Sequence, residues 1–353
     1  MIEAGEYAED GAAAMSAAAP RRARPSVGRV LAIGAPIVYV ASLTISILIN
    51  GAPIARDQMF LWLLLGMAAC SISAWRRWGL MLLEWLPFFG LLVAYDYLRG
   101  AASVADQNAH ILPQIAFERV LTLGGEIPTV WLQERLYDPD RLPWYDVAAW
   151  CVYMTHFFVI WIVAAVLWQV AHDRFRRYIA VLVTLTLFGY LTYWLYPAQP
   201  PWLTSQLGEI GPVSRIVPSV WGHLGFPTAQ TFFETGDGLV NLVAAMPSLH
   251  AAYPFMLLLF FWSSGWWVRA GLGLYTLAMA FALVYGGEHF IVDALFGYVL
   301  ALLAFAVVDG VPRVAAWVRR SGTRPRLGTK PTGSACTCER LGSDASSTYW
   351  EPL

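Results

Sequence analysis

Long apolar segments separated by short polar turns run through most of this 353-residue chain. A helix that crosses a bilayer needs about 20 predominantly apolar residues. About eight segments approach this length and are predicted to be transmembrane helices: 27–49, 59–74, 79–98, 147–171, 178–195, 249–262, 268–285 and 290–308. The pattern predicts an all-α fold, a polytopic membrane helix bundle.

Two polar segments flank the predicted membrane domain, which we place at residues 27–312. Residues 1–26 are rich in alanine and end in a cluster of arginines, whereas residues 313–353 are rich in glycine, serine, threonine and proline. Such compositions cannot bury enough apolar surface to fold. We expect both segments to be disordered cytoplasmic tails.

The composition supports a membrane protein and narrows its partners. Only 13% of the residues are charged and 58% are hydrophobic, whereas soluble domains are about 25% charged. The net charge of −1 gives no indication of a nucleic-acid partner. Four cysteines without a zinc-ligand pattern predict no metal site, and we expect no cofactor.

Arginine placement predicts the orientation, since cytoplasmic loops carry the excess of positive charge. Most arginines fall on one side if both termini are cytoplasmic. We expect a multi-pass protein of the cell membrane with two long extracytoplasmic connections, 100–146 and 197–247. Their length and apolar content favour functional lids at the membrane surface.

Two histidines and an aspartate are predicted to meet at the extracytoplasmic surface. His250 follows Pro247 and Ser248 at the start of one predicted span, and His289 begins another. Asp293 lies four residues after His289, on the same helix face, where it can orient the imidazole. Ser248 and the free N–H groups beside it are predicted to bind an anion. His250 is placed to give a proton to a leaving oxygen.

These motifs resemble those of a known family. Pro247-Ser248-Leu249-His250 followed by His289-x3-Asp293 resembles two signature motifs of the type 2 phosphatidic acid phosphatase superfamily. The segment from Tyr196 to Trp202 is similar to a Pro-rich segment of inositol phosphorylceramide synthases and their bacterial relatives. The resemblance covers about residues 95–301 and implies a six-helix phosphatase-like catalytic core at about 79–310.

The resemblance implies a metal-independent phosphotransferase that acts on a phospholipid or polyprenyl-phosphate-type substrate. His289 would attack phosphorus and form a phosphohistidine, Asp293 would orient it, and His250 would protonate the leaving group. A polar acceptor alcohol, such as inositol or a sugar, would then take the phosphoryl group. Tyr196, in the Pro-rich segment, is a candidate substrate contact.

The sequence departs from the superfamily pattern at a position whose side chain normally neutralises the charge of the phosphate. The wider family has an arginine six residues before the nucleophilic histidine, and here that position is Leu283. Arg99 and Arg215 are the candidate replacements, because both lie on the predicted outer side. Glu288, beside the nucleophile, is a candidate for binding acceptor hydroxyls.

Two other functions remain open at this point. A lipid phosphate phosphatase would use the same residues with water as the acceptor. A proton-coupled transporter would use the histidines as a relay, although most ionisable residues cluster at one surface. Asp146, Tyr153 and His156 fit either an interhelical hydrogen-bond set or a part of the substrate site.

Overall fold

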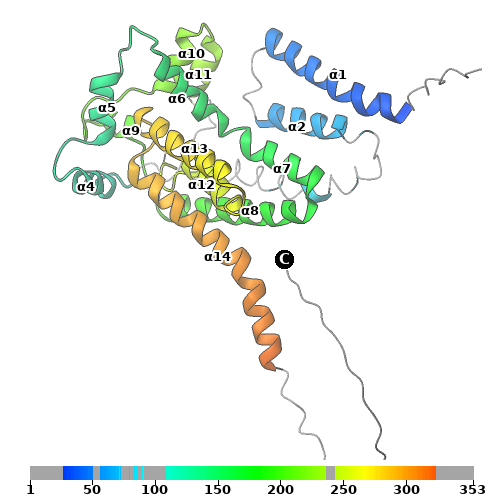
Figure 1. Cartoon of the computed structure of the whole chain (residues 1–353). Coiled ribbons are helices and arrows are strands. Elements are labelled where there is room, and N and C mark those ends of the chain that lie inside the picture. Colours follow the sequence, from blue (N-terminus) through cyan, green and yellow to red (C-terminus); the bar gives the residue numbers. More distant parts are fainter. Residues whose placement is uncertain are drawn as a thin grey trace, which may run out of the picture. The chain divides into compact units, whose positions relative to one another are not determined.

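The computed structural model describes residues 27–50, 56–70, 109–235 and 243–322, with scattered positions between 72 and 90. Within these ranges the chain is helical, and the only strand-like pairings there are isolated bridges that join His110 to Ala198 and Ala198 to Ala244. The predicted all-α fold is confirmed (Figure 1). The tail 1–26, Arg99, most of 79–98 and residues 323–353 lie outside the described residues.

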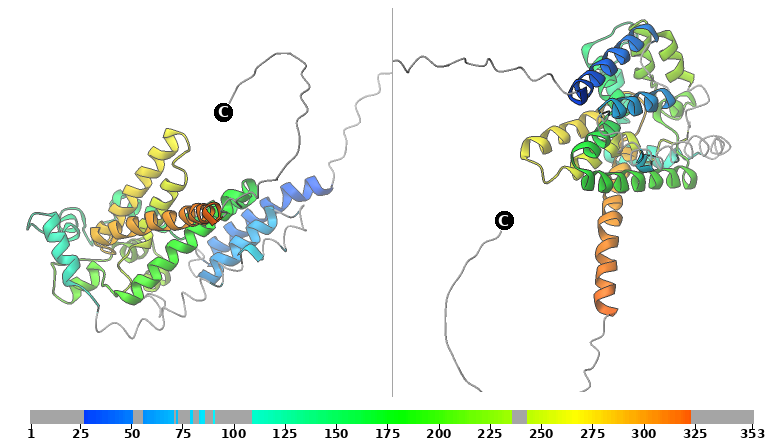
Figure 2. Two further views of the ribbon diagram at one scale, coloured as in Figure 1. Left: turned by 90° about the horizontal axis from the view of Figure 1, so that it is seen from below. Right: turned by 90° about the vertical axis from the view of Figure 1, so that its right-hand side faces the viewer.

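Apolar helices overlap seven of the eight predicted segments, and most of the eighth, 79–98, lies outside the described residues. These helices are α1 (Val27–Asn50), α2 (Arg56–Cys70), α6 (Trp144–Thr155), α7 (Val159–Val170), α8 (His172–Leu195), α12 (Leu249–Phe260), α13 (Trp266–Tyr285) and α14 (Ile291–Gly322). α14 continues past residue 312, where the membrane domain was expected to end. α1 and α2 pack side by side, as do α7 and α8 (Figure 2).

Fewer helices than expected are long and apolar enough to span a membrane. Three helices among the described residues meet this criterion of length and apolar composition: His172–Leu195, Trp266–Tyr285 and Ile291–Gly310. The segment predicted as one span at 147–171 is two helices, α6 and α7, bent by 46°, and counts as a fourth if it is one crossing. Leu31–Ser46, Leu61–Cys70 and Leu249–Phe260 are apolar but shorter. A multi-pass bundle is consistent with these helices, whereas the count of eight is not confirmed.

Apolar packing holds the central helices together. α12 packs against α13 and α8, and α13 also packs against α6 and α5. The largest core cluster includes the fully buried side chains of Leu182, Leu185 and Met256. Leucines on the outer faces, such as Leu187, Leu191 and Leu274, are exposed. An apolar outer face is the surface that a lipid bilayer covers.

The described parts of the two long connections, 109–146 and 197–235 with 243–247, contain five short helices. They are α4 (Leu112–Leu121), α5 (Pro128–Leu136), α9 (Pro201–Gln206), α10 (Ile216–His223) and α11 (Pro227–Thr235). α4, α5 and α9 each have proline at the first or second helical position, where the missing N–H costs nothing. α5 contacts α13 and α10 contacts α6, so the short helices cover one end of the bundle (Figure 1).

A glycine allows α12 and α14 to approach closely at this end. A Cβ atom built on Gly297 would lie 2.4 Å from the carbonyl oxygen of Ser248 and 3.3 Å from the Cβ atom of Ala252. Real Cβ atoms do not approach backbone oxygen this closely, so a larger residue must separate the two helices. Gly297 therefore sets how near the starts of the two helices lie.

Replacing Gly297 with alanine is expected to lower stability by about 1–3 kcal/mol, the usual cost of overpacking. It should also lower turnover, because it moves the start of α12 away from α14. Thermal unfolding in detergent and kcat would be measured together. Gly273→Ala is the matched control, since nothing lies within 4 Å of a Cβ atom there. Equal behaviour of the two variants would contradict the close-approach argument.

Candidate active site

Ser248 fixes the start of α12 against α14. It is the N-cap of α12, and its hydroxyl oxygen accepts a hydrogen bond from the N–H of Ala251 at 3.3 Å. Its own N–H donates to the carbonyl oxygen of Asp293 at 2.9 Å. Ser248 was predicted to bind an anion, but this N–H is already used between the helices. In the first turn, the N–H of Ala251 is used as well, so the N–H groups of Leu249 and His250 are the candidates for an anion.

A glycine turn places His289 at the start of α14. Gly287 has φ +77°, a left-handed conformation that favours glycine. The N–H groups of Glu288 and His289 then both donate to the carbonyl oxygen of Leu283. The side chain of Leu283, where the wider family has arginine, is fully buried in the core.

His289 and Asp293 form the expected pair, with Asp293 in the first turn of α14 and His289 two residues before its first residue. The His289 Nδ1 atom lies 3.5 Å from Asp293 Oδ2, and the aspartate side chain has no exposed surface. The same Oδ2 atom accepts a hydrogen bond from the N–H of Phe290 at 2.9 Å, which fixes the carboxylate. With Nδ1 facing the carboxylate, Nε2 is the nitrogen left for chemistry.

His250 lies beside His289 although 39 positions separate them in the numbering of the chain. The two ring centroids are 5.5 Å apart, with 52° between the ring planes. Both rings are therefore close enough to contact one phosphoryl group. Three helices, α12, α13 and α14, produce this juxtaposition by returning the chain to the same end of the bundle.

Aromatic rings from α6 pack against His250. The ring of His156 lies 3.8 Å from that of His250, and the ring of Tyr153 stacks on it at 5.0 Å. His156 follows the last residue of α6, at the break before α7. These two deeper polar residues thus adjoin the site, whereas Asp146 accepts a hydrogen bond from Tyr285 and joins α6 to α13.

Arg215 and Glu288 form a mostly buried ion pair next to the histidines. Arg215 Nε lies 3.0 Å from Glu288 Oε1, Nη2 donates to Oε2 at 3.1 Å, and the side chains are only 13% and 10% exposed. The guanidinium also donates to the carbonyl oxygen of Phe233 and lies 4.6 Å from the ring centroid of Trp202. The two residues proposed for phosphate and acceptor binding therefore contact each other first.

Breaking this pair on one side is expected to destabilise the protein. Arg215→Met leaves the Glu288 carboxylate buried without its cation, which typically costs about 3–5 kcal/mol. Adding Glu288→Gln to that variant should recover part of the loss, because the uncompensated charge disappears. Thermal unfolding of the single and double variants measures this. Additive losses would mean that the pair is not coupled.

Tyr196 ends α8 close to the site. Burial raises the pKa of its phenol, and the carboxylate of Asp293 acts in the same direction, which places Tyr196 within electrostatic reach of the aspartate. Its ring lies 4.0 Å from that of His110. Since the neutral phenol can both donate and accept hydrogen bonds, Tyr196 can contact a substrate oxygen. Arg99, the other predicted phosphate contact, lies outside the described residues.

Two residues near the site were not predicted from the sequence. Gln133 of α5 donates from Nε2 to the carbonyl oxygens of Ser214 and Tyr285, and its Oε1 accepts from the N–H of Ser214. Glu118 of α4 accepts a hydrogen bond from the N–H of Val292 at 3.1 Å. Each is a polar residue on a buried helix face. This position is the only feature by which the sequence could have indicated either residue.

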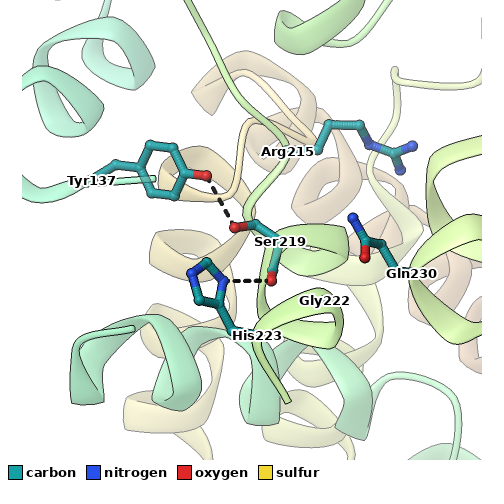
Figure 3. Close-up of a pocket in the computed structure, with 6 residues that line it drawn as sticks. All are labelled: Tyr137, Arg215, Ser219, Gly222, His223 and Gln230. Atoms are coloured by element: carbon teal, nitrogen blue, oxygen red, sulfur yellow. Dashed lines mark hydrogen bonds between the residues drawn. The ribbon is translucent and has the colours of Figure 1, made fainter. Parts of the chain in front are cut away.

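A polar cavity of about 450 Å³ lies next to Arg215. Its other lining residues are Tyr137, Ser219, Gly222, His223 and Gln230. Tyr137 donates a hydrogen bond to the Ser219 hydroxyl at 3.1 Å, and the His223 ring contacts the Ser219 carbonyl oxygen at 2.9 Å (Figure 3). The guanidinium points away from these hydroxyls (Figure 3). Hydroxyl, imidazole and amide groups suit a hydroxyl-rich ligand. Among the described residues, no group of three potential metal ligands comes together.

Comparisons with known proteins identify the family of the chain. A family model described as the PAP2 superfamily matches residues 115–307, which include both histidines and Asp293. A phosphoinositol dihydroceramide synthase from Bacteroides thetaiotaomicron is 28% identical over 160 residues, 42% of this chain and 52% of the relative. The chain thus spans about half the length of that relative. No solved structure matches. The resemblance to this branch is confirmed, and the chain belongs to the PAP2 superfamily.

Proposed function

We propose that this protein is an integral membrane lipid phosphotransferase that works through a phosphohistidine at His289. The observation that carries the proposal is the pair of imidazole rings 5.5 Å apart, one of them 3.5 Å from a fully buried aspartate. A carboxylate that orients one ring nitrogen leaves the other as a nucleophile. The family match supports the general class, which also includes phosphatases.

In the first step, His289 Nε2 attacks phosphorus and the bond to the leaving oxygen breaks. His250 gives its proton to that oxygen, and Asp293 stabilises the positive charge on the His289 ring. In the second step, the acceptor hydroxyl loses its proton to His250 and its oxygen attacks the phosphohistidine. His289 and His250 return to their starting states. Each histidine thus has one role per step, as a nucleophile or as a proton carrier.

The charge of the site favours a phosphodiester over a phosphomonoester. A phosphomonoester carries more negative charge than a phosphodiester. The wider family neutralises this charge with an arginine at the position of Leu283. Among the described residues, the candidate cation is Arg215, and Glu288 already compensates its charge. A phosphodiester needs less compensation. Transfer from a phosphodiester lipid to an alcohol therefore suits this site better than hydrolysis of a lipid phosphate.

The polar cavity supports a hydroxyl-rich headgroup or acceptor. It shares Arg215 with the ion pair beside His289 and offers the hydroxyls of Tyr137 and Ser219. The name of the Bacteroides relative denotes a phosphoinositol lipid product, and inositol or a sugar fits such a lining. We place the site on the extracytoplasmic side of the cell membrane, with both termini in the cytoplasm, as the arginine distribution predicts.

Trapping the covalent intermediate tests this function. Purified protein would be mixed with phospholipids labelled at phosphorus, both monoesters and diesters, and quenched at alkaline pH, where a phosphohistidine survives. Label on the peptide that contains His289 would support the proposal. Product formation that requires added inositol or sugar favours a transferase, and free phosphate released with water alone favours a phosphatase. Turnover with no label at His289 would exclude the mechanism.

A further inference from the structure

Glu118, on α4, accepts a hydrogen bond from a backbone N–H group in the first turn of α14. Its Oε1 atom accepts a hydrogen bond from the N–H of Val292 at 3.1 Å, across 174 positions of the chain, and its side chain is 0% exposed. The first four N–H groups of a helix lack partners within the helix. Asp293 Oδ2 accepts from Phe290 in the same turn. Two carboxyl groups therefore cap the first turn of α14, which contains Asp293 and directly follows His289.

We infer that Glu118 is a positioning residue of this site: its carboxyl group holds the first turn of α14, and with it His289 and Asp293, in place against α4. This inference rests on the proposed function, because positioning matters only if His289 and Asp293 react. The apolar contacts in the same region are those of Ile115 and Val130 with Phe290. They fill space but do not fix the rotation of the helix start, which a hydrogen bond does.

The carboxyl group of Glu118 binds its proton more tightly than an exposed glutamate does. Burial raises the pKa of Glu118 to about 7, the negative charge of Asp293 acts in the same direction, and the hydrogen bonds from Val292 and Ile291 oppose them. Among the described residues, Asp293 is the charged group that acts on Glu118, and Asp293 lies beside His289, whereas Arg119 next to Glu118 is exposed. Below pH 7, Glu118 is thus mostly neutral, and its carboxyl oxygen still accepts the hydrogen bond from Val292.

Two variants separate the hydrogen bond from the charge. Glu118→Gln keeps an acceptor for the N–H of Val292 and cannot ionise, so it copies the neutral acid. Glu118→Ala removes the acceptor. At pH 6 we expect Glu118→Gln to keep kcat within about threefold and Glu118→Ala to lose about 10-fold to 10²-fold, the usual effect of a small displacement of reacting groups. Glu134→Ala, at an exposed position of α5, is the matched control.

The pH dependence of stability supplies a readout that does not need activity. The pKa of Glu118 is about 4.5 when unfolded and about 7 when folded. The folded state binds the proton more tightly, so this stabilisation is complete below pH 4.5 and is lost as pH rises through 7. Because glutamine cannot ionise, the Glu118→Gln variant should not lose this stabilisation between pH 4.5 and pH 7. Its melting temperature relative to the wild type should therefore rise between pH 5 and pH 7.

Hydrogen–deuterium exchange completes the test. Glu118→Ala should speed exchange in the peptide that contains Val292, whereas Glu118→Gln should not. Wild-type kcat and exchange in Glu118→Ala would overturn the inference, and so would a loss in Glu118→Gln as large as that in Glu118→Ala. If the wild type forms no phosphohistidine, the proposed function fails, but the exchange and melting measurements still report on Glu118. The two failures are therefore distinguishable.

Discussion

Replacing His289 with alanine is expected to lower turnover by about 10⁴-fold or more, the scale of losing a covalent nucleophile. The reason is geometric as well as chemical. The His250 ring is 5.5 Å from the His289 ring but lies on α12, without the Asp293 carboxylate beside it. It cannot take over as an oriented nucleophile. Labelled phospho-enzyme should disappear together with turnover.

His172→Ala is the matched control for this loss. His172 begins α8, and its Nε2 atom lies 3.0 Å from Glu84 Oε1. α8 has 24 residues and ends beside the site at Tyr196. At about 1.5 Å per residue, the two ends of such a helix lie roughly 36 Å apart. The His172 variant should therefore keep wild-type turnover and labelling. Labelled protein in the His289 variant would assign the nucleophile to another residue.

Replacing Asp293 with asparagine is expected to lower kcat by about 10²- to 10⁴-fold, as for other carboxylates that orient a catalytic imidazole. The amide oxygen can still accept the hydrogen bond that Phe290 gives to Oδ2. The helix start should therefore stay folded. What is lost is the negative charge that selects the His289 tautomer and stabilises its positive charge. KM should change much less than kcat.

Single-turnover labelling separates this effect from misfolding. Asp293→Asn should form the phosphohistidine slowly but to completion, because His289 is still present. Asp173→Asn serves as the control, since Asp173 lies in the first turn of α8 and is exposed. It should label at the wild-type rate. An Asp293 variant with the wild-type labelling rate would show that the aspartate does not activate His289.

The three parts of the catalytic set differ in how far the sequence reveals them. His289 and Asp293 are four residues apart, so helical spacing predicts that they meet. The structure brings them together with Asp293 in the first turn of α14 and His289 just before it. His250 requires a further step, the return of the chain through α13, which the run of apolar segments also predicts. The all-α fold follows from the same runs, because every backbone polar group in lipid must be satisfied within the segment.

Other contacts are invisible to a local pattern. Arg215 and Glu288 are 73 positions apart, and their ion pair turns two separately predicted binding residues into one unit. The bend of 46° between α6 and α7 replaces one predicted straight crossing and brings His156 against His250. Neither segment contains a glycine or an internal proline that would mark the bend.

By itself the sequence determined the all-α fold, the meeting of the two histidines at one end of the bundle and the His289–Asp293 pair, because hydropathy and residue spacing act over short stretches of the chain. The tertiary structure alone decided that Glu118 caps α14, that Gln133 ties α5 to the turn after α13, and that Gly297 brings α12 onto α14. These are contacts between segments far apart in the chain. Their partners are set by how the helices pack, and no local rule encodes that packing.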